Sequence, residues 1–64
     1  MRVICNEYRI GKEKLIIEHD PMKNNYYFKV IDIKTSKLRY ESEPIAHIIP
    51  ARAKGFEFMG IKSS

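Results

Sequence analysis

The sequence predicts a small, mainly β fold: an antiparallel sheet or barrel of four to six strands, with one possible short helix near residues 43–54. Two observations lead to this prediction. Runs of β-branched and aromatic residues alternate with turn signals along most of the chain. The 64 residues are 44% hydrophobic and 31% charged, which is ordinary for one folded domain over residues 1–64 and too apolar for a disordered chain.

Three strands are predicted in the first half of the chain, over residues 3–10, 14–19 and 26–34. Gly11 with Lys12 makes a tight turn between the first two, because glycine accepts positive φ without steric cost. The run HDPMKNN precedes the third strand and contains Asp-Pro and Asn-Asn, which are strong turn signals. The third strand, YYFKVIDIK, is rich in the residues that strands favour.

A fourth strand over residues 38–42 is predicted to pair with the third through the turn KTSK. With Thr35 and Ser36 at the tip, the cross-strand pairs are Lys34 with Lys37, Ile33 with Leu38, Asp32 with Arg39, and Ile31 with Tyr40. One pair joins opposite charges and two join apolar residues, which stabilises a ladder. The pair of lysines repels unless an anion binds nearby.

The third strand carries apolar residues on both faces, so the position of the core has to be chosen. We expect it on the side of Ile31, Ile33, Leu38 and Tyr40, with partners drawn from Ile4, Leu15 or Ile17, and Phe56 or Phe58. The opposite face, with Tyr26, Phe28 and Val30, is then open. The alternative is a small closed barrel in which Tyr26 and Phe28 are buried against Phe56 and Phe58.

The last third of the chain fits either a helix or two strands. Ser42 as a cap, Pro44 in the first turn and Gly55 as a stop favour a helix near residues 43–54. Pro50 counts against a continuous helix, because proline inside a helix costs about 3 kcal/mol. Strands at 45–49 and 56–61 are the alternative, and we favour the helix.

Residues that usually carry catalytic or metal chemistry form no recognisable motif. Cys5 is expected to be a small buried hydrophobe on a strand. His19 points away from its neighbours Glu18 and Asp20 on a strand, so the three cannot bind one ion. His47 is expected at a boundary, and the three glycines are isolated. We therefore expect no enzyme activity, no cofactor and no metal site.

The single cysteine and the lack of a long apolar run bear on location. Small secreted domains of this size usually contain several disulfides, and one cysteine cannot form any within the chain. The N-terminal apolar patch is interrupted too early for a signal peptide. No apolar run approaches the ~18 residues that a membrane span needs. We expect a cytoplasmic protein with no membrane partner.

Positive charge is concentrated between residues 22 and 40. The whole chain has a net charge of +4 and a pI near 9.4. This stretch holds five basic residues against Asp32 alone. The predicted open face therefore carries aromatic rings at one end and cations at the other. Sheet-based modules hold single-stranded nucleic acid by stacking bases on aromatic rings and contacting phosphates with Lys and Arg.

These observations predict a small non-enzymatic binding module that binds nucleic acid through a basic and aromatic β-hairpin. The candidate residues are Tyr26, Tyr27, Lys29, Lys34, Lys37 and Arg39. The cations would contact phosphate, and one of the two tyrosines would stack on a base. The alternative is a protein-interaction module, a small regulator or inhibitor that docks on an acidic protein surface. A homo-oligomer joined through an edge strand is a further alternative.

The run LIIEHDPMKNNYYFKVIDIKTSKLRYESEP resembles the paired-hairpin pattern of the flagellar FlaG family. The resemblance lies in the spacing of Asp32, Thr35 and Arg39 and covers about half of the chain. The glycine that follows the threonine in that family is missing here, and we infer no function from the resemblance.

Overall fold

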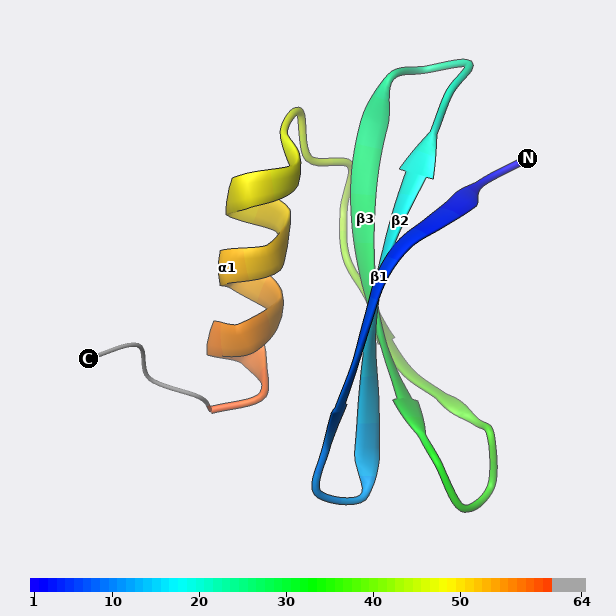
Figure 1. Cartoon of the computed structure of the whole chain (residues 1–64), viewed down its shortest axis with the longest axis vertical. Coiled ribbons are helices and arrows are strands. Elements are labelled where there is room, and N and C mark those ends of the chain that lie inside the picture. The colour runs from blue at the N-terminus through cyan, green and yellow to red at the C-terminus, as the bar shows by residue number, and fades with distance from the viewer. Residues whose placement is uncertain (61–64) are drawn as a thin grey trace.

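A computed structural model describes residues 1–60 as a four-stranded antiparallel sheet with one helix across one face (Figure 1). The elements are β1 (Val3–Ile10), β2 (Glu13–Asp20), β3 (Asn25–Asp32), β4 (Leu38–Glu41) and α1 (Ile48–Phe58). Strands adjacent in sequence are adjacent in the sheet, in the order β1-β2-β3-β4. The predicted small antiparallel sheet with a short helix is confirmed, and the sheet is open rather than closed into a barrel.

The meander places the β1–β2 and β3–β4 turns at the same end of the sheet (Figure 1). Gly11 adopts φ +61° in the first of these turns, as its predicted role requires. The N–H of Ile33 donates to the carbonyl of Lys12 over 3.1 Å, so the two turns are in direct contact. The β2–β3 turn lies at the opposite end.

The helix begins later than predicted because the segment before it continues along β3. Tyr26 and Ile45 exchange backbone hydrogen bonds of 2.6 and 2.8 Å. His47 is the N-cap, so Pro50 is the third residue of α1. Backbone N–H groups in the first turn have no acceptor within the helix, and proline is tolerated there. No helix within residues 1–60 is long and apolar enough to cross a membrane.

Gly55 does not end the helix, contrary to the prediction; it lies inside α1 and is buried. A Cβ atom at this position would lie 2.8 Å from Cδ1 of Leu15 on β2. Glycine therefore allows the helix to approach the sheet closely. Residues 56–58 continue the helix, so the alternative of a strand beginning there is wrong.

The core lies on the opposite side of the sheet from the one predicted. Its buried cluster is Leu15, Ile17, Phe28 and Val30, and the partly buried residues packed against it are Tyr8, Ile45, Ile48, Phe56 and Met59. In the β2–β3 register Leu15 pairs with Val30 and Ile17 with Phe28, so the apolar sides of both strands coincide. The barrel alternative correctly placed Phe28 in the core, but the sheet is open and α1 covers this face instead.

The predicted register of the β3–β4 hairpin is also wrong. Ile31 pairs with Leu38 and Val30 with Tyr40, with an irregularity between these two positions. The carboxylate of Asp32 accepts the N–H of Lys34 at 2.9 Å and that of Thr35 at 3.2 Å, so the chain begins to turn earlier than expected. Leu38 is consequently 53% exposed rather than buried.

Candidate nucleic-acid interface

The six predicted contact residues do not form one continuous surface. Tyr26 and Tyr27 lie near the β2–β3 end of the sheet, whereas Lys34 and Lys37 lie at the other end, beyond the last residue of β3. A strand rises roughly 3.3 Å per residue, so the rings and these cations are separated by most of the length of β3. The predicted combination of stacking and phosphate contact therefore cannot be made at one point.

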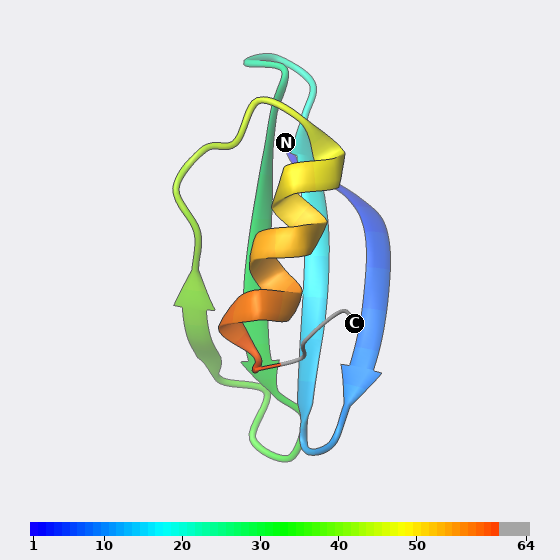
Figure 2. The ribbon, with the colours of Figure 1, turned by 90° about the vertical axis from the view of Figure 1, so that its left-hand side faces the viewer.

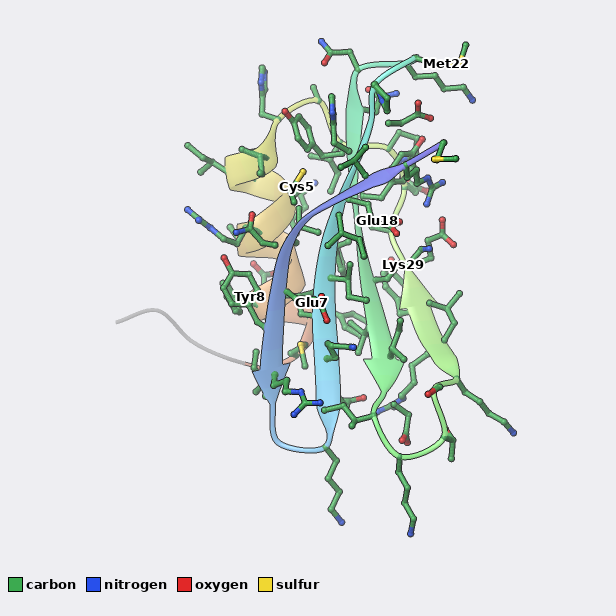
Figure 3. The ribbon with its side chains drawn as sticks, turned by 45° about the vertical axis from the view of Figure 1, so that its right-hand side comes forward. Cys5, Glu7, Tyr8, Glu18, Met22 and Lys29 are labelled. Atoms are coloured by element: carbon green, nitrogen blue, oxygen red, sulfur yellow. The ribbon has the colours of Figure 1, made fainter. Side chains whose placement is uncertain are left out.

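Tyr27 and Lys29 lie on the open face, the side of the sheet away from α1. The Arg2 guanidinium carbon is 3.7 Å from the centroid of the Tyr27 ring, which is only 6% exposed. Lys29 Nζ lies 3.1 Å from Oε1 of Glu18, and Figure 3 shows both side chains on this face. The ring is thus covered and the lysine is already paired.

Three cations and three carboxylates cover the open face. Besides Lys29, Arg2 contacts Glu41 at 2.6 Å and Glu18 at 3.4 Å, and Lys14 contacts Glu7 at 3.0 Å. The hydrogen bond from Arg2 lowers the pKa of the Glu41 carboxyl below its ordinary value. The aliphatic parts of such side chains shield apolar surface while their charged ends stay in water. Ile16 beneath them is only 7% exposed.

Tyr26 occupies the face covered by α1. Its ring stacks on that of His19, with centroids 4.6 Å apart, and the residue is half-buried. The His19 Nε2 atom lies 3.2 Å from Oδ1 of Asn24 in the following turn. As predicted, His19 and Glu18 face opposite sides of the sheet. One side of the Tyr26 ring is therefore occupied by an intramolecular contact.

The remaining candidates belong to a larger group of cations that we call the basic end: Arg9, Lys12, Lys34, Lys37 and Arg39. Contact between the β1–β2 and β3–β4 turns brings this group together. Arg39 pairs with Glu13, but the other four are exposed and form no ion pair with any residue of 1–60. Sequence reasoning missed Arg9 and Lys12, which the meander order alone would have placed beside the second turn.

Charge counting shows how uneven this distribution is. The two turns and the strand ends beside them contain six basic residues against the acidic residues Glu7, Glu13 and Asp32. This end therefore has a net charge of +3, compared with +4 for the whole chain. Asp32 is also occupied by the backbone hydrogen bonds that shape its turn. Of the five cations of the basic end, only Arg39 is held in an ion pair with residues 1–60.

A groove of about 340 Å³ lies between β4 and α1, outside the basic end. It is lined by Phe28, Tyr40, Ser42, Glu43, Pro44, Ile45, Lys54, Glu57 and Phe58. The rings of Tyr40 and Phe58 stack with centroids 4.3 Å apart, and both remain substantially exposed. Sequence reasoning assigned Tyr40 to the core and missed the groove, because it arises only when the helix is placed on the sheet.

The residues considered for metal or nucleophile chemistry are dispersed. Among residues 1–60 no group of three His, Cys, Asp or Glu side chains lies close enough together to hold a metal ion. Cys5 is exposed rather than buried, and it lies at an irregularity in β1 between Ile4 and Asn6. Desolvation raises the pKa of Asp20, but hydrogen bonds from the N–H groups of Lys23 and Met22 and nearby positive charge together lower it below its ordinary value.

Comparison of the chain with known protein families, with curated proteins and with solved structures gives no significant match. The FlaG-like hairpin spacing is therefore not supported by a family match, and function has to be argued from the surface itself.

Proposed function

We propose that this chain is a small non-enzymatic module that binds nucleic acid by contacting its phosphates with the basic end. The observation that carries the proposal is the location of Arg9, Lys12, Lys34 and Lys37 at one end of the sheet, all exposed and without ion pairs to residues 1–60. Cations that neutralise phosphates release condensed counterions, which supplies most of the affinity of sequence-independent binding. The proposal keeps the cytoplasmic setting expected from the single cysteine.

The proposed contacts are to phosphates alone, and neither tyrosine is proposed to stack on a base. Tyr27 lies beneath Arg2, and Tyr26 stacks on His19 at the far end of the sheet. Lys29 is left out as well because it pairs with Glu18 on the open face. Flexible lysines on two turns suit a repeating row of phosphates better than one particular base sequence.

An acidic protein surface would meet the same cations and would also be sensitive to salt, so nucleic acid has to be tested directly as the partner. Each phosphate contact contributes roughly 0.7 to 0.9 to the slope of log affinity against log salt, so three to four contacts give a slope of about −2 to −4. The test is a fluorescence-anisotropy titration of single- and double-stranded DNA and RNA of one length at several salt concentrations. Binding to all of them with such a slope is expected.

A matched pair of charge reversals locates the contact. Lys37→Glu should weaken binding and make the slope shallower by the share of about one phosphate, close to 1. Lys23→Glu changes the net charge equally but lies in the β2–β3 turn, at the opposite end of the sheet. It should bind nearly as the original chain does. Equal losses in the two variants would mean that only net charge matters, and absence of binding at low salt would remove the proposal in favour of a protein partner.

A further inference from the structure

We propose that the groove between β4 and α1 binds an extended protein segment, which adds to the free edge of β4 and inserts one aromatic or long aliphatic side chain beside Tyr40 and Phe58. This inference is independent of the basic end. Among residues 1–60 the groove is where exposed aromatic rings, a free strand edge and unpaired charges lie together. Each of these features restricts the occupant.

The first feature is the aromatic floor. Tyr40 is 40% exposed and Phe58 49% exposed, although their rings stack on each other and both lie at a tilted angle to the ring of Phe28. Figure 2 shows why: α1 lies over the middle of the sheet and leaves β4 beside it uncovered. An apolar side chain placed here would gain contact with two exposed rings, the kind of packing that anchors protein interfaces.

The second feature is the edge of the sheet. The Ser42 N–H donates to the carbonyl of Phe28 over 2.9 Å and so faces β3. Because successive N–H groups of a strand point to opposite sides, the N–H and carbonyl of Glu41 face away from the sheet. An added strand can pair with them, and its alternate side chains then fall on the side of Tyr40.

The third feature is charge, and it selects the class of partner. Glu43 and Glu57 line the groove against Lys54 alone, and none of the three is in an ion pair with residues 1–60. A nucleic acid would bring phosphates to two carboxylates, which repel them. A peptide with basic residues beside its apolar anchor is complementary to this surface. The occupant we infer is therefore a peptide of that composition.

The probe is a short β-prone synthetic peptide with one central phenylalanine flanked by lysines, titrated into the isotope-labelled chain and followed by NMR. Shifts should be centred on Tyr40, Glu41 and residues 54–58. Replacing the phenylalanine of the peptide by alanine should weaken binding by about tenfold or more, the cost typical of a buried interface anchor. The Glu41 amide should also become protected from hydrogen exchange, which a contact through side chains alone would not cause.

Three variants of the chain test the assigned contacts. Phe58→Ala should weaken peptide binding by about tenfold, whereas Ile49→Ala, an exposed apolar residue of α1 outside the groove, should not. Glu57→Lys should weaken binding of the lysine-flanked peptide and strengthen binding of a glutamate-flanked one. Partial unfolding of the variant cannot produce such a reversal. Lys37→Glu should bind the peptide normally, which keeps this inference separate from the proposed function.

Other outcomes would overturn the inference. Shifts of the groove residues on raising the protein concentration without peptide would identify a second copy of the chain as the occupant. The same shifts with oligothymidylate would identify nucleic acid instead. Equal binding of the lysine- and glutamate-flanked peptides by the original chain, or shifts elsewhere on the surface, would show that the groove does not select this partner.

Discussion

The two faces of the sheet exclude water by different means. Under α1, Leu15, Ile17 and Val30 are fully buried by a second layer of secondary structure. On the open face, Ile16 and Tyr27 are buried nearly as well, but beneath charged side chains held by ion pairs. Burial on a sheet face therefore does not require a covering helix. The stability contributed by the two faces should therefore depend differently on salt, since salt screens exposed ion pairs but does not screen apolar packing.

The largest expected effect contrasts a residue beneath the helix with one that the sequence wrongly assigned to the core. Leu15→Ala should lower the free energy of unfolding by about 2–5 kcal/mol, because it leaves a cavity under α1. Leu38→Ala should change it by less than about 1 kcal/mol, since Leu38 is more than half exposed. Urea unfolding of both variants measures the difference, and equal losses would contradict the core described above.

Gly55→Ala tests how closely the helix-covered face is packed. Alanine should favour the helix by about 1 kcal/mol, but its Cβ would lie 2.8 Å from the buried Leu15. Overpacking costs about 1–3 kcal/mol, so a net loss of about 1 kcal/mol is expected.

The control for this effect is a double-mutant cycle. In a Leu15→Ala background the clash is gone, and Gly55→Ala should then raise stability. The same sign in both backgrounds would show that the close approach of α1 to β2 is not the reason for the glycine.

Arg2→Met tests the cover of the open face. It retains an unbranched apolar side chain but removes the charge over Tyr27 and the contacts to Glu18 and Glu41. Partly exposed ion pairs and a cation–π contact are each worth up to about 1 kcal/mol, so a loss of roughly 1 kcal/mol is expected. Thermal unfolding at low and high salt measures it, and the loss should shrink at high salt. Arg52→Met is the control, because Arg52 is exposed and forms no ion pair with residues 1–60.

The smallest expected effect is the pH dependence of the same contact. The pKa of Glu41 is lowered by its hydrogen bond from Arg2, against an ordinary value of 4.5. Its contribution to stability is fully present above pH 4.5 and is lost as the pH falls through the lower pKa of the folded state. The urea midpoint should therefore fall less over this acidic range in Arg2→Met. If the urea midpoint falls equally with pH in Arg2→Met and in the original chain, the contact between Arg2 and Glu41 does not cause this pH dependence.

Local signals along the chain were sufficient for the four strands and for the presence of a helix, but the two ends of the helix and the contacts between elements were not predictable in the same way. The bounds of β1 and the turn at Gly11 follow from alternation and from the freedom of glycine. The core side of β3 depends on which face of β2 meets it, and both strands carry apolar residues on both faces. Ile16 and Ile31 have the composition of core positions in the sequence, but both lie on the open face, where charged side chains shield Ile16.

The candidate site was predictable to the same limited extent. Lys34, Lys37 and Arg39 stand out as a local excess of charge, whereas Arg9 and Lys12 join them only through the order of the strands. The predicted repulsion between Lys34 and Lys37 rested on a register that Asp32 changes by accepting two backbone N–H groups in the turn. One of Tyr26 and Tyr27 was expected to be accessible, and the sequence does not reveal that Arg2, 25 positions before Tyr27, lies over the Tyr27 ring.

The place of α1 at the end of the element order has a consequence for how the chain folds. Each strand pairs with its neighbour in sequence, so the sheet can form from contacts of short sequence separation, which favours rapid folding. The helix that covers Leu15 and Val30 is synthesised only after all four strands. Until residues 48–58 are available, a nascent sheet presents its apolar row to water and to other chains. Docking of α1 is thus the step that ends exposure to misassembly, and variants that delay it should aggregate during synthesis before they lose stability once folded.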